Sequence, residues 1–153
     1  MPGQPSVFVD APVLLCADDR RDAARQAQAA RWLDALWARR CGALSTQVLH
    51  EYYVGATHPS LAQPLGPGDA RAKVRRYQQW QPWQIDHQTV ETAWGVEARH
   101  GTDYWTALVV AAAAHSGCRY LLTEALPHGQ RMDAIQTVNP FLLSPEDLLA
   151  AAP

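Results

Sequence analysis

The stretch that decides the fold is SVFVDAPVLL, residues Ser6–Leu15, in which a short apolar run ends at Asp10. The run VFV is β-branched or aromatic throughout and carries no charge, which is typical of a strand buried on both faces. Pro12 then stands in the first turn of an expected helix over Val13–Ala17, where the amide that proline lacks would be unpaired anyway. Open α/β sheets place their chemistry at the carboxyl ends of such strands, so Asp10 is the first candidate site residue.

The composition is that of one globular domain. The chain has 153 residues, of which 48% are hydrophobic and 18% charged, so we expect a single domain over residues 1–153 with a substantial core. The net charge of −2 gives no global signal for nucleic acid, and any such binding would need a local basic patch. Three widely spaced cysteines without a CxxC pair argue against a disulfide framework or a zinc site. With no signal peptide and no apolar run long enough to span a bilayer, the sequence predicts a soluble cytoplasmic protein without membrane contact.

Outward from the first strand, helical and strand-like segments alternate along the chain. Helical patterns cover residues 21–40, 46–56, 70–80, 87–100 and 104–116, and a final short helix begins at 144. Strands are expected at 43–44, 83–85 and 120–123, with an edge strand at 135–138. This alternation predicts an α/β fold, a three-layer α/β/α sandwich with a central parallel sheet between helices.

Three acids could meet at one edge of that sheet, because right-handed crossovers bring the carboxyl ends of parallel strands together. Asp10 follows the first strand, Glu124 follows the strand ending at Thr123, and Glu51 lies in the helix after the second strand. Carboxylates grouped in this way would bind a hard cation such as Mg²⁺, which could activate water against a phosphodiester. The alternative is that Asp10 caps a helix and that both glutamates are solvated, and spacing alone favours this alternative.

Several segments in a fixed order resemble a PIN domain of the VapC-type toxin group. They are VFVDAPVLL (residues 7–15), LSTQVLHEYYV (44–54), DYWTALVVAAA (103–113) and GCRYLLTEALPHGQ (117–130), followed by VNPF (138–141). The resemblance runs from Val7 to about Phe141. It implies Mg²⁺- or Mn²⁺-dependent endoribonucleases with a small acidic site, usually paired with an antitoxin and often dimeric.

Carried over position by position, the resemblance implies that Asp10 and Glu51 are metal ligands, while other site positions have changed. The third acid of the family falls on Thr106, the fourth on Ala125, and the asparagine of the first motif on Pro12. Threonine offers a neutral oxygen and alanine offers none. Because the loss of even an outer partner costs ~10–100-fold in metal affinity or activity, we expect metal binding and hydrolysis to be weak or lost.

Neighbouring residues could compensate for the missing acids. Glu124 adjoins Ala125 and could reach a metal. Asp103 lies one helical turn before Thr106 and is better explained as a helix cap than as a ligand. The Thr106 hydroxyl could orient a water or a phosphate, although a bond back to its own helix is the favoured interpretation. His128, in a Pro-His-Gly turn, either stabilises the turn or contacts substrate.

A basic segment could hold an RNA backbone, because its cations alternate with the aromatic residues Tyr77 and Trp80. The cations are Arg71, Lys73, Arg75 and Arg76. A solvated helix face is the favoured alternative.

Histidines and tryptophans have structural explanations. His50 is beside Glu51 but about 100° away around a helix, so we expect it outside the site of Glu51. Four tryptophans are expected to pack in the core or in a dimer interface rather than to stack on bases. They are Trp32, Trp37, Trp94 and Trp105.

These observations support three hypotheses. The leading one is a PIN-type ribonuclease-like protein whose acidic site is degenerate and whose nuclease activity is weak or lost. The second is an active Mg²⁺-dependent endoribonuclease of a toxin–antitoxin pair that uses Asp10, Glu51 and Glu124, assisted by Thr106. The third is a non-catalytic module that binds RNA or an antitoxin-like partner.

Overall fold

One five-stranded sheet forms the centre of the protein. The computed structural model describes residues 6–60 and 63–149, so both ends of the expected 1–153 domain lie outside the described residues. The strands are β1 (Val7–Val9), β2 (Gly42–Ala43), β3 (Tyr120–Leu122), β4 (Arg131–Met132) and β5 (Ile135–Val138), in the order β2-β1-β3-β5-β4. All neighbours pair in parallel except β4 and β5, so the predicted α/β fold is confirmed.

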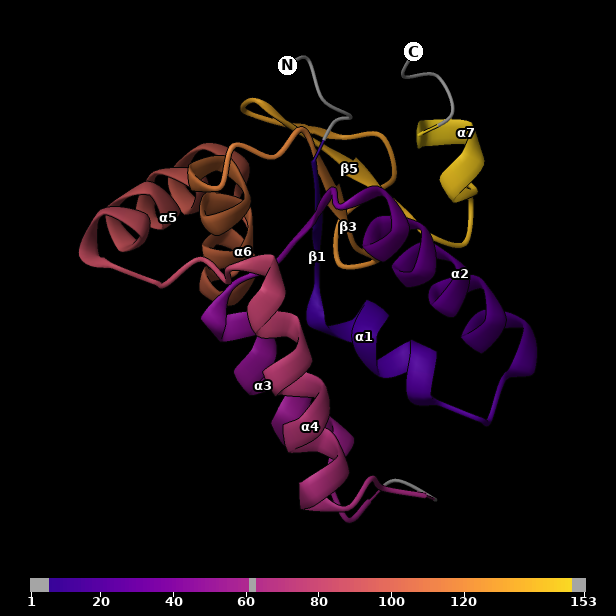
Figure 1. Cartoon of the computed structure of the whole chain (residues 1–153). Helices are drawn as coiled ribbons and strands as arrows, with labels where there is room; N and C mark the ends of the chain where they lie inside the picture. The colour runs from indigo at the N-terminus through magenta and orange to yellow at the C-terminus, as the bar shows by residue number, and fades with distance from the viewer. Residues whose placement is uncertain (1–5, 61–62, 150–153) are drawn as a thin grey trace.

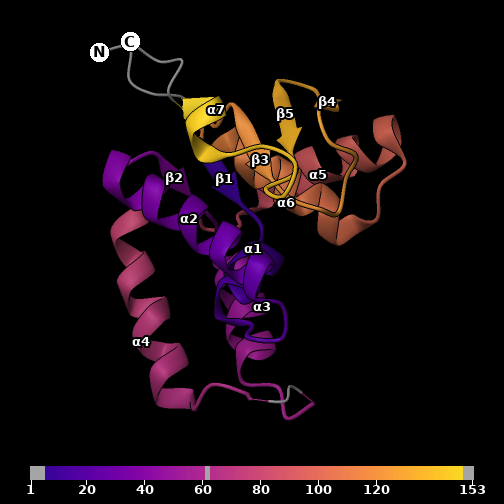
Figure 2. The ribbon, with the colours of Figure 1, turned by 90° about the vertical axis from the view of Figure 1, so that its right-hand side faces the viewer.

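Helices lie on both faces of the sheet. They are α1 (Ala11–Asp18), α2 (Ala23–Arg39), α3 (Thr46–Ala56), α4 (Pro67–Tyr77), α5 (His87–His100), α6 (Tyr104–His115) and α7 (Pro145–Leu149). Figure 1 shows α5 and α6 on one side of the strands and α2 on the other, while α3 and α4 extend beyond the carboxyl edge. From a second direction α4 is an outer helix at the side of the molecule, beyond α3 (Figure 2). The carboxyl edge of the sheet is therefore bordered by α1 and α3.

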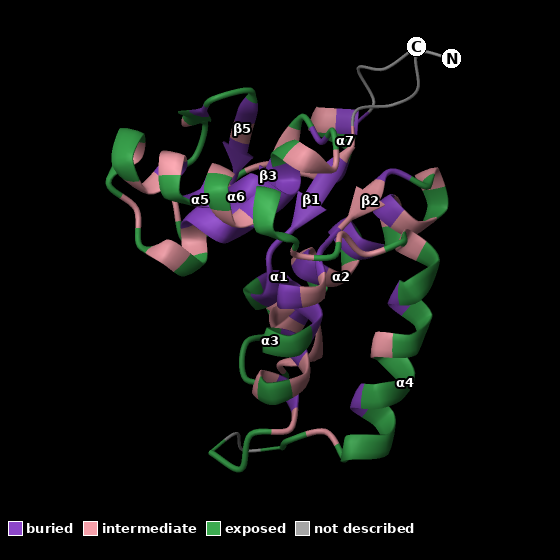
Figure 3. Cartoon of the chain, turned by 90° about the vertical axis from the view of Figure 1, so that its left-hand side faces the viewer, coloured by how far each residue is buried: buried purple, intermediate pink, exposed green. Residues whose placement is uncertain are grey.

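The first strand is the most deeply buried element, as its sequence predicted. Its three residues are 0% exposed, and the neighbouring strands β3 and β5 are largely buried as well, whereas most of α4 is exposed (Figure 3). Trp32 of α2 is also fully buried. Its indole N–H donates to the carbonyl oxygens of Pro140 at 2.9 Å and Leu143 at 3.1 Å, which fixes the segment after β5 on that helix.

Two predicted strands differ from the structure. Residues 83–85 form no strand: Trp83 makes an isolated parallel bridge to Ser45, because Pro82 lacks an amide for a ladder and Asp86 already caps α5. The strand at 135–138 is not at the edge, since β4 pairs with it in antiparallel fashion. A two-residue strand is too short to give a sequence pattern of its own.

The helix predicted over 70–80 also has different bounds. It begins at Pro67, which suits the first turn of a helix, and ends at Tyr77, after which Gln78–Trp80 form a single 3₁₀ turn. This turn brings Trp80 against Trp37 and Tyr77, with ring centroids 4.9 Å apart in both cases. The aromatic cluster closes the side of the molecule next to β2.

Gly42 provides the space for this cluster, and its replacement tests the packing. A Cβ atom at Gly42 would lie 2.6 Å from Trp80 Cζ2, which is too close for any real contact. We expect Gly42→Ala to lower the free energy of unfolding by about 1–3 kcal/mol in urea titrations, as overpacked cores do. Gly68→Ala is the control, because a Cβ there meets nothing within 4 Å. Equal stabilities of the two variants would contradict the proposed clash.

Candidate functional site

Asp10 is held at the carboxyl end of β1 by two hydrogen bonds. The residue is 7% exposed, and its carboxylate caps α1 by accepting the Ala11 N–H at 2.9 Å. The hydroxyl of Thr123 donates to its other carboxylate oxygen at 2.8 Å. Because Val9 pairs with Leu122, the next residue of each strand falls beside the other. Burial raises the pKa of Asp10. The two hydrogen bonds lower this pKa in part, and the charge of Asp103 raises it.

Glu51 and Asp103 reach the same edge from α3 and α6. Burial raises the pKa of Glu51, the hydrogen bond from Gln47 lowers it, and the charges of Asp10 and Asp103 raise it. Gln47, one turn before Glu51, donates its amide N–H to Glu51 Oε1 at 3.0 Å and to the Trp105 carbonyl oxygen at 3.2 Å.

Thr106 belongs to the cap of its helix. Asp103 accepts the Thr106 N–H at 3.0 Å and the Thr106 hydroxyl at 2.7 Å, and these bonds lower the pKa of Asp103. Asp103 is therefore the helix cap that was predicted. The Thr106 hydroxyl bonds back to the start of its own helix, through the side chain of Asp103 rather than through a backbone carbonyl.

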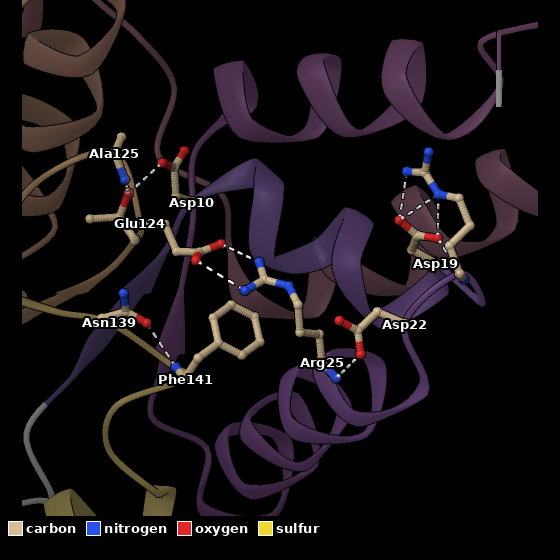
Figure 4. A network of polar contacts seen from close by, with 10 residues as sticks. Asp10, Asp19, Asp22, Arg25, Glu124, Ala125, Asn139 and Phe141 are labelled. Carbon is tan, nitrogen blue, oxygen red and sulfur yellow. Dashed lines mark hydrogen bonds and ion pairs between the residues drawn. The ribbon is translucent and has the colours of Figure 1, made fainter.

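Glu124 has a different partner from the other acids. It pairs with Arg25 of α2 through two bonds, from Nη2 to Oε1 at 2.6 Å and from Nη1 to Oε2 at 3.3 Å. Figure 4 shows its carboxylate directed toward Arg25 and away from the carboxylate of Asp10. Arg25 and Glu124 line a cleft of about 820 Å³ along the outer side of α1, together with Cys16. Burial raises the pKa of the Cys16 thiol, whereas the charge of Arg25 lowers it and that of Glu124 raises it.

Thr123 and Arg25 were not among the predicted site residues. The parallel register of β1 and β3 would have pointed to Thr123, since it is the residue that follows the partner strand. Its hydroxyl also accepts the Ala125 N–H at 3.0 Å, so Ala125 contributes a backbone amide and no oxygen ligand. No spacing in the sequence indicates Arg25, which lies 99 residues from Glu124.

The residues at this edge do not fit a metal ion well. Within residues 6–60 and 63–149, no group of three or more His, Cys, Asp or Glu side chains is arranged to hold one. The acids have protein partners instead: Asp10 has Thr123, Glu51 has Gln47, Asp103 has Thr106, and Glu124 has Arg25. Mg²⁺ would have to compete with these partners for the oxygens that it prefers.

Three of the four predicted RNA-binding cations contact the body of the protein. Lys73 pairs with Asp18, Arg71 donates to the Tyr53 hydroxyl at 3.2 Å, and the Arg76 guanidinium lies 4.5 Å from the centre of the Trp37 ring. The fourth, Arg75, is exposed. These contacts attach α4 to α1, α2 and α3.

His128 stabilises a turn. Its Nδ1 accepts the Asn139 N–H at 3.0 Å, which joins the Pro-His-Gly turn to the segment after β5. This contact favours the first of its two predicted roles.

His50 differs from expectation, and two exposed tryptophans leave the dimer interface as the expected role open to them. A groove of about 550 Å³ between α3 and α6 is lined by both His50 and Glu51, so the prediction that they would lie apart was wrong. The groove is wide enough to include residues that lie about 100° apart around α3. Trp105 lines the same groove and is 62% exposed, and Trp94 is 49% exposed, so neither packs in the core.

The mostly parallel five-stranded sheet with helices on both faces defines the class of protein, an α/β domain. Among solved structures, the chain is similar to the crystal structure of VapC20 from Mycobacterium tuberculosis, a toxin that cleaves the sarcin-ricin loop. The TM-score is 0.59, the sequence identity is 22%, and the match covers 76% of this chain and 87% of that one. The similarity therefore shows that the two proteins share a fold. No protein-family model and no curated protein sequence matches the chain, and among the described residues no helix is long and apolar enough to cross a membrane.

The raised pKa of Asp10 predicts how pH affects stability. Because the folded state holds this proton more tightly than the unfolded chain, stability falls as pH rises from about 4 through the folded pKa. Asp10→Asn lacks this titration. We therefore expect the stability of the variant relative to the wild type to increase between pH 4 and pH 7, measured by urea unfolding at each pH. A difference that is independent of pH, or that decreases toward pH 7, would contradict the burial of an ionised Asp10.

Proposed function

We propose that this chain is a cytoplasmic VapC-like PIN protein in which metal-dependent endoribonuclease activity is weak or lost. The observation that carries the proposal is that the carboxylates at the edge are bonded to groups of the protein itself. Thr106, at the position of the third acid, is one of those groups. Ala125, at the position of the fourth, supplies only an amide N–H to Thr123.

The missing acids are the expected cause of the lost activity. When bound, Mg²⁺ or Mn²⁺ would supply charge stabilisation and an activated water for phosphodiester hydrolysis. Asp10 and Glu51 remain at the edge, but two carboxylates with raised pKa values form an incomplete set of ligands. We expect the folded protein to be stable without metal, because its acids are already bonded to protein groups.

Restoring the acids tests this proposal. We expect no saturable binding in calorimetric titrations of the wild type with Mg²⁺ or Mn²⁺ up to millimolar concentrations. Thr106→Asp combined with Ala125→Asp should raise metal affinity by about 10-fold or more, since each substitution adds a carboxylate at the edge. The double variant with Asp10→Asn is the control and should lose that gain.

An RNA cleavage assay run beside the titration separates the two enzymatic hypotheses. Metal binding by the wild type, with cleavage that disappears in Asp10→Asn, would establish an active endoribonuclease that uses Asp10 and Glu51 and would overturn the proposal. No cleavage by the wild type supports it. Contact of RNA with Arg75 or other cations of α4 stays a prediction that a binding assay on the same RNA would test.

The exposed groove between α3 and α6 favours a second function, binding of a protein partner. Trp105, which is 62% exposed, lines the groove together with half-buried Ile85 and buried Leu108. Val54, one turn beyond Glu51 on α3, is 61% exposed but does not line the groove. Large exposed apolar side chains beside a groove are typical of interaction sites. A second copy of the chain is the occupant that we propose, and an antitoxin-like protein is the alternative.

Sedimentation experiments test the second function. We expect the wild type to dimerise and Trp105→Ser to weaken the dimer by about 10-fold or more, because aromatic residues at interface centres carry much of the binding energy. Trp94→Ser is the matched control, since Trp94 is also exposed but lies on α5, outside the groove. Equal effects of the two variants, or a monomeric wild type, would rule out a second copy in the groove.

A further inference from the structure

One buried polar atom in the groove between α3 and α6 has no partner. Gln47 is 9% exposed, and among the described residues no donor reaches its buried Oε1 atom. Its Nε2 group donates to Glu51 Oε1 at 3.0 Å and to the Trp105 carbonyl oxygen at 3.2 Å. Turning the amide over would place Oε1 against two acceptors, so these bonds fix which end of the amide lacks a partner. A buried acceptor without a donor costs free energy, which a donor from a binding partner would recover.

The same groove carries a donor on its exposed side. Trp105 is 62% exposed and lines the groove together with Gln47. The indoles of Trp32 and Trp83 donate to acceptors of the chain at 2.9 Å, whereas the described residues hold no acceptor for the indole of Trp105. An indole N–H is a donor only. The groove therefore has a buried acceptor in need of a donor and an exposed donor in need of an acceptor.

Two-fold symmetry lets these two groups satisfy each other. In a symmetric dimer, a contact of one residue with a second is repeated with the two copies exchanged. Gln47 and Trp105 are neighbours, since the amide of the first bonds to the carbonyl of the second. A two-fold axis through the groove therefore brings both pairs within reach at once. Any other partner would need its own donor and acceptor at the matching spacing, which a second copy of the chain already carries.

We propose that the Trp105 indole of each copy donates to Gln47 Oε1 of the other, which gives two equivalent hydrogen bonds across the axis. The inference deepens the second function proposed above and rests on it, because it names the contact that makes that dimer specific. Since Oε1 is covered in the single chain, a side chain of the groove changes its rotamer as the copies meet, as is common at interfaces. Trp105, being exposed, has the room to do so.

The contact extends to the candidate site through Gln47. The other end of the Gln47 amide holds the Glu51 carboxylate, so a donor on Oε1 fixes the amide from both sides. The indole of one copy and the amide and carboxylate of the other then form one chain of hydrogen bonds, in which each bond strengthens the next. Gln47 is thus a positioning residue, and the second copy completes its support of Glu51.

Sedimentation of conservative variants tests the contact on the full chain. Trp105→Phe keeps an aromatic ring but loses the N–H, and Gln47→Met keeps the length of the side chain but loses the acceptor. We expect each to raise the Kd of the dimer by about 10-fold or more, because every dimer loses two equivalent bonds. Trp94→Phe is the matched control and should leave the Kd unchanged, since Trp94 is exposed on α5 and lies outside the groove.

The double variant Trp105→Phe/Gln47→Met separates the bond from the loss of ring area and from the role of Gln47 in its own chain. If the two groups bond to each other, the second change costs little once the first is made. The Kd of the double variant should therefore be close to that of the more weakened single variant. Losses that multiply in the double variant would overturn the proposal.

The indole N–H signals in nuclear magnetic resonance spectra give a readout that needs no folded Gln47 variant. Trp105→Phe and Trp94→Phe assign the signals of the two exposed indoles. We expect the Trp105 N–H of the wild type to exchange more slowly with solvent as the dimer forms, and that of Trp94 to stay unchanged. Equally fast exchange of the Trp105 N–H in monomer and dimer would overturn the proposal.

The outcomes distinguish this inference from the second function on which it rests. A monomeric wild type overturns both. A dimer that Trp105→Ser weakens, but that Trp105→Phe and Gln47→Met leave intact, supports a second copy in the groove and overturns only the hydrogen bond to Gln47. Coupled losses in the two conservative variants support both the dimer and its contact.

Discussion

The hydrogen bond from Thr123 to Asp10 connects the ends of the two central strands, and the arrangement of the acidic edge depends on it. It forms because β1 and β3 pair in parallel with Val9 opposite Leu122. The bond orients Asp10, which in turn caps α1, and it places the turn that carries Glu124 and Ala125. A buried carboxylate without such partners would be costly, so the bond is also what allows Asp10 to remain there.

Much of the fold was predictable because local rules agree with the tertiary structure. The uncharged run before Asp10 favours a central strand, and polar residues that can cap helices, Ser45 or Thr46, Asp86 and Asp103, precede three helices. The predictions that failed concern strands that are very short or pairings between residues far apart in the sequence. The strand β4 has two residues, and the bridge of Trp83 involves a single residue, so neither produces a period that a sequence reveals.

The candidate site was predictable in position but not in its contacts. The edge follows from topology, which places Asp10 directly after β1 and Thr123 directly after β3. The direction of Glu124 depends on Arg25, which is remote in sequence and appears there as an ordinary residue of a surface helix. Thr106 shows the same limit: its place in the chain predicts a lost ligand, and only the geometry shows that it has become a partner of Asp103.

The indole of Trp32 has a consequence for how the chain assembles during synthesis. It donates to the carbonyl of Pro140, 108 residues later, so α2 leaves the ribosome long before the segment that covers it. Until that segment emerges, the Trp32 indole lacks its hydrogen-bond acceptors and the side of α2 that faces α7 has no cover, which exposes the nascent chain to aggregation. Contacts between such distant residues also slow folding. Completion of the core is thus one of the last events in the biogenesis of this protein.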